Sequence, residues 1–435
     1  MDMPRYRICA PQRPVANRGG FESPMTGQFA NGAQRQRHIV LIHRYFYPDT
    51  PPYASILRDI AISLGESDVR VTILTCQPSY NRSVVNHAEA YERLADNVTV
   101  RRFGVVDDRR STLLKIVNMV WFAVRILTES RRLGRVDAIM AASTPPIGIA
   151  RAGLMLARIK RAAFVYHHQD IHPEILNPSG KLSLLNSVLL RIDTATDTRS
   201  SKVVVLSPDM AETIRRRGIH PERIQIINNF DPWTVNPPSE RSGVSAKSRS
   251  LVVAYTGNIG RFQGLDGVFD TLLELRNEDV EFHFIGDGPL RVRLEELVTN
   301  NALTNVTVHG QLHPQKVAEF LRQRADVGLV TLNKGVERAA YPSKCMTYLR
   351  NQLGLLTAVD PKSALVHDIR AYNAGWNADP DVKGELAEVI KTLIDNRATV
   401  TETGENARKM YESEFAPSLA LARWVKLFDD VTGAD

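Results

Sequence analysis

The sequence predicts an α/β protein with two doubly wound parallel sheets. Short apolar runs alternate with amphipathic segments along most of the 435 residues, which is the pattern of parallel strands covered by helices on both faces. The alternation stops at residues 234–249, which hold Pro, Ser, Gly and Lys but almost nothing apolar, and it then restarts. At about 100–200 residues per domain, this length also favours two domains. The predicted domains are therefore residues 38–233 and 250–410, joined by a linker at 234–249.

The first half opens with an apolar run at residues 39–42, as expected for a strand buried on both faces. Its first predicted helix, 54–65, carries apolar residues at helical spacing and ends at Gly65. Further helices are predicted at 111–132, 147–159 and 208–218. Further strands are predicted at 69–76, 97–103, 137–143, 162–170, 202–207 and 223–230.

The second half repeats this pattern. Its predicted strands are 251–257, 280–286, 305–310, 325–331 and 354–359. Its predicted helices are 264–276, 289–299, 314–323, 344–352 and 382–395. Residues 411–435 are predicted to form a C-terminal helix that packs back toward the first domain. Ligands of open parallel sheets bind outside the carboxyl ends of the strands, so we expect those ends to face each other across a cleft.

The charge balance favours anionic partners. The formal net charge is +7 and the pI is about 9.3. Such a balance suits nucleic acid, anionic lipid or phosphorylated small molecules. Because there is no dense Lys/Arg run of the kind that binds nucleic acid, no nucleic-acid partner is expected.

The cysteines and the N-terminal segment favour a cytoplasmic protein. Cys9, Cys76 and Cys345 are far apart and without C-x-x-C spacing, which supports neither a disulfide framework nor a zinc site. Residues 1–37 are rich in Arg, Pro, Gly, Asn and Gln, lack an apolar signal region, and are predicted to be a disordered tail. No apolar run reaches the ~18 residues that a membrane span requires.

A first loop of the second half could approach an anion closely. Gly257, Asn258 and Gly260 follow a predicted strand and precede a helix, where glycines admit a ligand and free amides favour negative charge. Arg261 adds a positive charge. No G-K-[ST] follows, so the loop is not a P-loop, and an ordinary tight turn remains the alternative.

A second loop has similar features. Gly286, Asp287 and Gly288 lie between a predicted strand and a helix, with Pro289 suited to the first helical turn. The alternative is again a turn, in which Asp287 caps the helix.

A third candidate is the helix start within "AAYPSKCMTYLRNQLGLLTAV". Ser343 is a candidate N-cap, which would leave the amides of Lys344, Cys345 and Met346 unpaired. A helix N-terminus carries the equivalent of about half a positive charge, and the flexible side chain of Lys344 adds a full positive charge. This helix start is therefore a candidate binding site for a diphosphate. The alternative is an ordinary capped helix that binds no ligand.

A polar cluster ends one strand of the first half. The segment "YHHQDIHPEIL" contains His167, His168, Gln169, Asp170, His172 and Glu174. Such clusters suit metal binding or acid–base chemistry. Because strand alternation places His167 and His168 on opposite faces, they are poor joint ligands, and no metal site is predicted.

Residues 109–135 contain an unusually wide apolar band. Leucine, isoleucine, valine, tryptophan and phenylalanine lie between basic residues at both ends, as in a helix at a membrane interface. A core helix with solvated ends explains the pattern equally well.

These motifs together resemble a known family. The phrases are "HRYFYPDTPPYASILRDIAISL", "STPPIGIARAGLMLARI", "QDIHPE", "VVVLSPDMAETIRRRGI", "YTGNIGRFQGLDGV", "IGDGPLR" and "YPSKCMTYL". In this order and spacing, the chain resembles the GT-B glycosyltransferases of family 4, which are retaining enzymes that use nucleotide-sugar donors. It is most similar to the branch that builds bacterial O-antigen and exopolysaccharide units, including L-fucosamine-type transferases.

The resemblance implies a GT-B fold of two Rossmann-like domains facing a cleft, and a role for each predicted residue. The donor would bind the second half at Gly257, Asn258, Arg261, Gly286, Asp287, Gly288, Ser343, Lys344 and Thr347. The acceptor would bind the first half at His168 and Gln169, with Asp170 and Glu174 as the candidate catalytic groups. No cofactor and no metal are expected.

Two departures from the family pattern concern the donor site. Thr347 stands where the family has a glutamate that binds the ribose hydroxyls, and a hydroxyl is a weaker acceptor than a carboxylate. An earlier family glutamate falls on Ala339, with Glu337 nearby but out of register. In the first half, "TPPYAS" replaces the usual Gly-Gly of the acceptor loop.

The expected function is transfer of a sugar, with retention, from a nucleotide diphosphate to a polyprenyl-diphosphate-linked saccharide. The expected location is the cytoplasm, peripheral to the inner face of the cytoplasmic membrane. Three alternatives remain: a sugar-nucleotide epimerase, a non-catalytic binding relative, and a soluble transferase with a small acceptor.

Overall fold

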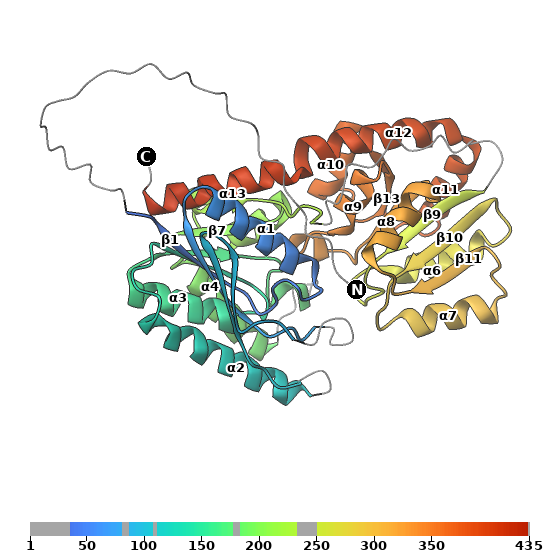
Figure 1. Cartoon of the computed structure of the whole chain (residues 1–435). Helices are drawn as coiled ribbons and strands as arrows, with labels where there is room; N and C mark the ends of the chain where they lie inside the picture. The colour runs from blue at the N-terminus through green and yellow to red at the C-terminus, as the bar shows by residue number, and fades with distance from the viewer. Residues whose placement is uncertain (1–34, 81–86, 108–110, 177–182, 233–249, 434–435) are drawn as a thin grey trace, which may run out of the picture. The chain divides into compact units, whose positions relative to one another are not determined.

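The computed structural model describes residues 35–80, 87–107, 111–176, 183–232 and 250–433 (Figure 1). Nearly all of the predicted tail at 1–37, and the whole predicted linker at 234–249, lie outside these residues.

The first half contains an eight-stranded sheet in the order β3-β4-β2-β1-β5-β6-β7-β8. Its strands are β1 (His38–Ile42), β2 (Arg70–Cys76), β3 (Tyr91–Ala95), β4 (Val98–Phe103), β5 (Ala138–Ala142), β6 (Ala163–His167), β7 (Lys202–Val205) and β8 (Ile224–Ile226). Neighbouring strands run parallel, with Ile39 opposite Val71, except that β3 is antiparallel to β4. The predicted doubly wound parallel sheet is confirmed, with one antiparallel edge strand that was not predicted.

Helices cover both faces of this sheet. They are α1 (Pro52–Glu66), α2 (Thr112–Thr128), α3 (Gly148–Lys160), α4 (Leu184–Asp197) and α5 (Pro208–Arg216), with short turns η1 (Glu129–Arg131), η2 (Glu174–Leu176) and η3 (Pro221–Arg223). Side-chain alternation along β1 explains the two layers. Ile39 and Leu41 pack with α1, whereas Val40 and Ile42 pack with α2 and α3 on the opposite face.

The second half contains a six-stranded, all-parallel sheet in the order β11-β10-β9-β12-β13-β14. Its strands are β9 (Leu251–Thr256), β10 (Val280–Ile285), β11 (Val306–Gly310), β12 (Val327–Thr331), β13 (Gly354–Ala358) and β14 (Gly375–Ala378). Its helices are α6 (Leu265–Glu274), α7 (Arg291–Asn300), α8 (Pro314–Gln323), α9 (Lys344–Arg350), α10 (Ala364–Tyr372), α11 (Glu385–Asp395) and α12 (Arg397–Met410), with the turn η4 (Val336–Arg338). The second predicted parallel sheet is therefore also confirmed.

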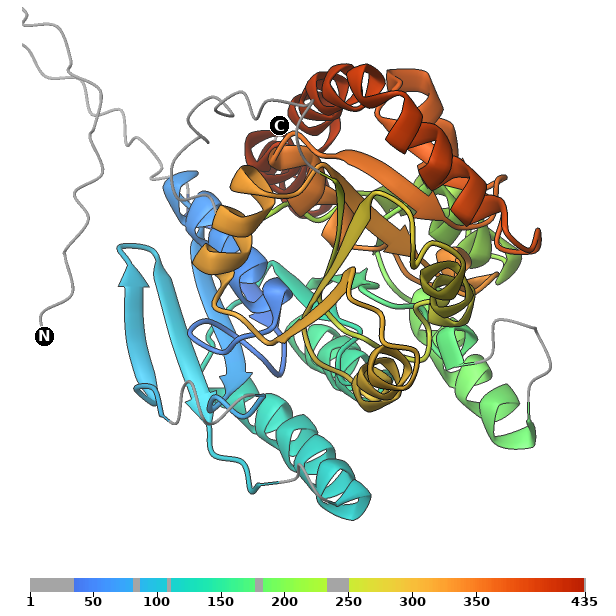
Figure 2. The same cartoon turned by 90° about the vertical axis from the view of Figure 1, so that its right-hand side faces the viewer.

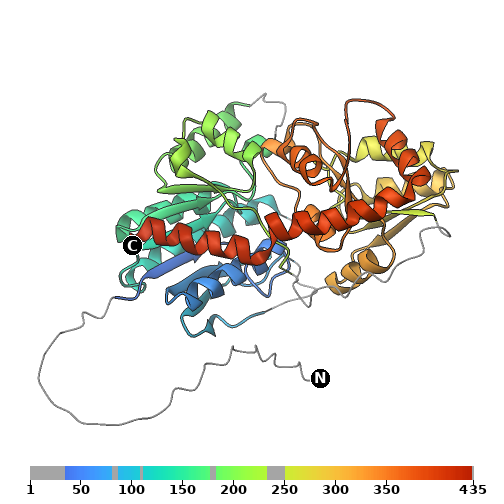
Figure 3. The same cartoon turned by 90° about the horizontal axis from the view of Figure 1, so that it is seen from above.

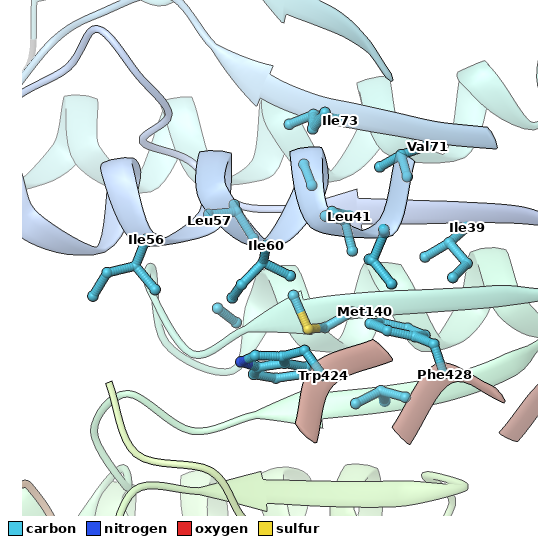
Figure 4. Packing of buried hydrophobic residues seen from close by; sticks show 14 of the residues in the cluster. Ile39, Leu41, Ile56, Leu57, Ile60, Val71, Ile73, Met140, Trp424 and Phe428 are labelled. Carbon is cyan, nitrogen blue, oxygen red and sulfur yellow. The ribbon is translucent and has the colours of Figure 1, made fainter. Parts of the chain in front are cut away.

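The C-terminal helix belongs to the core of the first half. After a π-helical turn, η5 (Tyr411–Phe415), helix α13 (Pro417–Thr432) runs along α1 (Figures 1 and 3). Trp424 and Phe428 are buried among Leu57, Ile60 and Met140 (Figure 4). The apolar side of this helix is therefore used to complete the first core.

Each sheet has a position at which the strand order reverses. In the first sheet β1 lies between β2 and β5, and in the second sheet β9 lies between β10 and β12. Loops that leave the carboxyl ends of strands at such positions diverge and open a crevice. The segment after β1 and the loop at Gly257 are therefore placed where a ligand is expected.

Candidate functional site

A cavity of about 570 Å³ is lined by residues from both halves. Such a volume is within the range of cavities that hold small molecules and cofactors. The first half contributes the ends of β1, β6 and β8, and the second half contributes the end of β9, the loop after β12 and the start of α9. The predicted site residues on this cavity are Gln169, Asp170, Gly257, Asn258, Ser343, Lys344 and Thr347.

Lys344 supplies a cationic side chain to this cavity from the second half. Its ammonium group donates to Gln263 Oε1 at 3.0 Å and lies 3.7 Å from the centre of the Tyr255 ring. Burial lowers the pKa of Lys344 to about 7. The amine is therefore poised to gain a proton when an anion arrives, because a nearby negative charge favours the charged form of an amine.

The start of α9 differs from the prediction. Ser343 has helical backbone angles and makes no side-chain capping bond, and it lines the cavity instead. The Cys345 N–H is not free, since it donates to Pro342 O at 3.1 Å. The predictions of a Ser343 cap and of an unpaired Cys345 amide were therefore wrong.

The Gly257 loop lies on the cavity, with the Gly286 loop behind it. Gly257 has a φ of +103°, which favours glycine, and a Cβ on Gly286 would lie 1.8 Å from the Gly257 carbonyl oxygen. Gly288 is similarly close to Ile259 O. The glycines at 286 and 288 therefore allow the loops to pack together, and the structure places neither on the cavity.

Two other predicted donor residues also lie off the cavity. Asp287 is exposed and accepts from its neighbour Gly288 N–H at 2.8 Å, and it also lies 3.8 Å from Arg291. Arg261 is exposed beside the cavity residue Phe262. Of the residues predicted as donor contacts in these two loops, Gly257 and Asn258 are the ones that line the cavity.

Asp170 faces the cavity from the first half. The Oγ of Ser143 accepts from the N–H groups of Gln169 and Asp170, at 3.0 and 3.2 Å. A backbone bridge joins Asp170 to Ala340 of the second half. Burial raises the pKa of Asp170 to about 6, which is suitable for a group that takes up and releases a proton near neutral pH.

Gln169 is held in a network of side chains. Its amide exchanges two hydrogen bonds with Asn229, at 2.7 and 3.3 Å, and lies 2.9 Å from His167 Nε2. His167 Nδ1 is in turn 2.8 Å from the Tyr53 hydroxyl. This chain of contacts fixes the orientation of Gln169 beside Asp170.

An aromatic wall that was not predicted from the sequence lines the cavity from the first half. The aromatic and imidazole rings of this wall are His43, Tyr45, Tyr53 and Tyr80. Tyr45 and Tyr80 meet edge to face at 5.5 Å, and Tyr80 is 60% exposed. The aromatic residues of "HRYFYP" directly after β1 were the available signal, since that strand ends at the crevice.

His168 and Glu174 belong to a buried ion network and not to the cavity. His168 Nε2 lies 2.8 Å from Asp197 Oδ1. Arg217 contacts both oxygens of Glu174, at 3.0 and 2.7 Å, and donates to Asp193 and Asp197 at 2.7 Å. The predictions of an acceptor-binding His168 and a catalytic Glu174 were therefore wrong, because His168 pairs with Asp197, Glu174 pairs with Arg217, and neither side chain lines the cavity.

The same network contains a group of possible metal ligands. Atoms of His168, Asp193 and Asp197 lie within 4.8 Å of one another. Arg217 already supplies a cation to both of these carboxylates. The cluster is best explained as a buried ion pair that fixes the segment after Asp170, since Arg217 also donates to His172 O at 2.7 Å.

Replacing this arginine should destabilise the fold. Arg217→Met leaves three carboxylates without their cation, and the loss of one partner of a buried ion pair costs about 3–5 kcal/mol. Urea unfolding measures the change. The matched control is Arg215→Met, because Arg215 forms an exposed pair with Glu212 that is worth about 0–1 kcal/mol. Equal effects of the two substitutions would contradict the structural role of Arg217.

The two family departures are visible in the structure. Thr347 lines the cavity, whereas Ala339 is buried in a core cluster of the first half. Glu337 is buried and lines a separate cavity of about 180 Å³ with Asp209. Glu337 therefore does not replace the missing carboxylate at position 339.

Two family patterns match the chain. The family described as "Glycosyl transferase 4-like domain" matches residues 53–229, and the family described as "Glycosyl transferases group 1" matches residues 238–410. Residues 230–237 separate the two matches, which together span most of both halves.

Named relatives are similar along most of their length. The chain is 22% identical over 320 residues to WbjE of Pseudomonas aeruginosa, which carries a glycosyltransferase name, covering 72% of this chain and 78% of WbjE. It is 24% identical over 297 residues to WcaI of Escherichia coli K12, named for glycosyl transfer in colanic acid biosynthesis, covering 64% of this chain and 72% of WcaI.

A solved structure has the same fold. Anabaena Alr3699/HepE in complex with UDP-glucose superposes with a TM-score of 0.65 and 16% identity, over 90% of this chain and 99% of HepE. At this identity the likeness concerns the arrangement of the two sheets alone.

Proposed function

The chain is a GT-B glycosyltransferase that combines a 4-like and a group 1 domain, and on this premise we propose that it transfers a sugar, with retention, from a nucleotide diphosphate to a saccharide acceptor. The single observation that carries the proposal is that Lys344 and Asp170, from opposite halves, line one cavity. A cation can stabilise the charge that develops on the leaving diphosphate, and a carboxylate can bind and orient the acceptor hydroxyl.

Lys344 is assigned to the leaving group. Sugar transfer from a nucleotide sugar develops negative charge on the diphosphate as the bond to the sugar breaks. A protonated Lys344 beside the phosphates would stabilise that charge. Gly257 would allow the backbone to approach the phosphates, and the proposal requires no metal ion.

Asp170 is assigned to the acceptor hydroxyl. Its raised pKa allows the carboxylate to accept a proton near neutral pH, or to orient the hydroxyl by a hydrogen bond. Gln169 and the aromatic wall lie on the same side of the cavity. Aromatic rings next to polar groups are suited to a saccharide, because sugars present both C–H and O–H surfaces.

The acceptor is proposed to be lipid-linked and to belong to bacterial surface polysaccharide synthesis at the cytoplasmic face of the membrane. The name of WcaI refers to colanic acid, which supports the polysaccharide part of this proposal. None of the described helices is long and apolar enough to span a membrane.

Nucleotide binding is the first test of this function. In a thermal-shift screen of nucleoside diphosphates, the one with the correct base should raise the melting temperature of the protein. A ligand that binds only the folded state stabilises it by about 2.7 kcal/mol when its concentration is 100 times Kd. Inorganic phosphate at the same concentration is the control for a general anion effect. A flat response to every nucleoside diphosphate would refute the proposed donor class.

A second candidate is a non-catalytic relative that binds a nucleotide sugar. Thr347 and Ala339 favour this candidate, because they lack the carboxylates found in the family. Release of free nucleoside diphosphate from a bound nucleotide sugar, with bacterial membrane extract as acceptor source, separates the two. Binding without release favours the non-catalytic relative.

A further inference from the structure

Three helices of the first half expose an unusual number of apolar side chains. More than half of the exposed large hydrophobic residues in the described part of the chain lie on α2, α3 and α4. We call the following residues the apolar face: Leu113, Leu114, Ile116, Val117, Val120, Trp121 and Val124 of α2, Met155 and Ile159 of α3, and Leu184, Leu185, Val188 and Ile192 of α4. Several are highly exposed, with Leu184 at 85% and Leu113 at 68%. So many exposed apolar side chains, on helices that contact one another, are more typical of an interaction site than of an ordinary surface.

The three helices form one layer on one side of the first sheet. Helix α3 packs against both α2 and α4, and Figures 1 and 2 show α2 and α3 along the same side of the sheet. Phe122 and Ile126 of α2 are buried in the same core cluster as Phe164 and Tyr166 of β6. Helix α4 joins this side, because its Asp193 accepts from the Tyr166 hydroxyl at 2.8 Å.

The apolar face is not required by the core. In each of the three helices, the side that packs on the sheet is not the side that carries the apolar face. The sheet-facing sides already supply the buried contacts. The apolar face therefore points outward along neighbouring helices. The sequence left open whether residues 109–135 form a core or an interfacial helix, and the exposure of α2 favours the interfacial one.

The exposed charged residues of these helices are all basic. Their basic residues are Lys115, Arg125, Arg151, Arg158, Lys160 and Arg191. The described residues of the three helices include two carboxylates, Asp193 and Asp197, and both are fully buried. The layer therefore offers apolar and basic groups together and no exposed acid, which is the composition of a surface that binds anionic lipid.

Trp121 is well placed for a lipid interface. Its indole N–H donates to Gly104 O at 3.1 Å, and its side chain remains 47% exposed. The ring can therefore enter the interface without leaving a buried donor unpaired, which would otherwise cost free energy.

We propose that the apolar face of α2, α3 and α4 docks on an anionic phospholipid surface. A second copy of the chain is a less suitable binding partner for this face. A symmetric dimer formed through it would bring the basic residues of the two copies together. The inference deepens the proposed function, because a lipid-linked acceptor would be presented at such a surface to the half that carries Asp170 and the aromatic wall.

Vesicle sedimentation of the full chain tests the proposal. Binding is expected to vesicles of phosphatidylcholine and phosphatidylglycerol, more weakly to phosphatidylcholine alone, and less at high salt. The double variant Val120→Glu/Leu185→Glu should bind anionic vesicles at least about tenfold more weakly, because it adds two charges to the apolar face. The matched control is Val292→Glu/Val382→Glu, which changes two exposed valines of the second half.

Three results would overturn the proposal. These are no binding of the unchanged chain to anionic vesicles, an equal loss in the control variant, and a dimer in light scattering that the double variant abolishes while vesicle binding is absent. Nucleoside diphosphate binding is measured on the same samples by thermal shift. If the unchanged chain binds no nucleoside diphosphate, the proposed donor class is refuted. The docking surface is decided by vesicle binding alone.

Discussion

Replacement of Lys344 by methionine should weaken nucleoside diphosphate binding about 30-fold or more. A hydrogen bond to a charged group contributes about 1.5–3 kcal/mol, and 2 kcal/mol corresponds to roughly a 30-fold change in affinity. Methionine keeps most of the side-chain volume against the Tyr255 ring, so the loss would report on charge. Isothermal titration calorimetry measures the change.

The pH dependence provides a second readout of the same residue. Since the pKa of Lys344 is about 7 in the free protein, the amine is mostly neutral above that value and must take up a proton to pair with a phosphate. Affinity for the nucleoside diphosphate should therefore fall as the pH rises from 7 to about 9 in the unchanged chain. Lys344→Met should show no such fall.

The control for this prediction is a lysine outside the cavity. Lys391 of α11 pairs with Glu274 and Glu388 on the surface, and Lys391→Met should leave nucleotide affinity unchanged. Full nucleotide affinity in Lys344→Met would remove Lys344 from the donor site.

The sheets could be predicted from sequence because their strands are buried on both faces. All residues of β1 and β9 are buried, so each appears in the sequence as an uninterrupted apolar run. Strand β3 (Tyr91–Ala95) was not predicted, because it is an antiparallel edge strand that is partly exposed. Such a strand carries polar and charged residues and therefore shows no apolar run. Helices α4, α10 and α12 were also missed, as was the short strand β14.

The candidate site was predicted in part because of where its residues fall along the elements. Asp170 follows a parallel strand and Lys344 begins a helix, and both positions open on the crevice of this fold. Sequence could not exclude Glu174, because its partner Arg217 lies 43 residues away and only the fold brings them together. Ser343 was mispredicted because capping depends on backbone angles that the residue type does not determine.

Replacement of Asp170 by asparagine should abolish most turnover and leave nucleotide binding intact. General acid–base groups contribute about 10²–10⁴-fold, so turnover should fall by at least about 100-fold. The fold should not be weakened, since an ionised carboxylate with a burial-raised pKa costs the native state free energy that asparagine avoids. Release of nucleoside diphosphate in the presence of bacterial membrane extract measures turnover.

The pH profile separates a proton-accepting role of Asp170 from a purely structural one. Its folded pKa of about 6 means that turnover should fall as the pH drops through 6, because the carboxylate becomes protonated and cannot accept the proton of the acceptor hydroxyl. Asp59→Asn is the matched control, since burial also raises the pKa of Asp59, which lies on α1 outside the cavity. An acidic limb that persists in Asp170→Asn, or an equal loss of turnover in Asp59→Asn, would refute the assignment. Loss of the limb together with retained nucleotide affinity would identify Asp170 as the group that acts on the acceptor, because the donor side would then be intact.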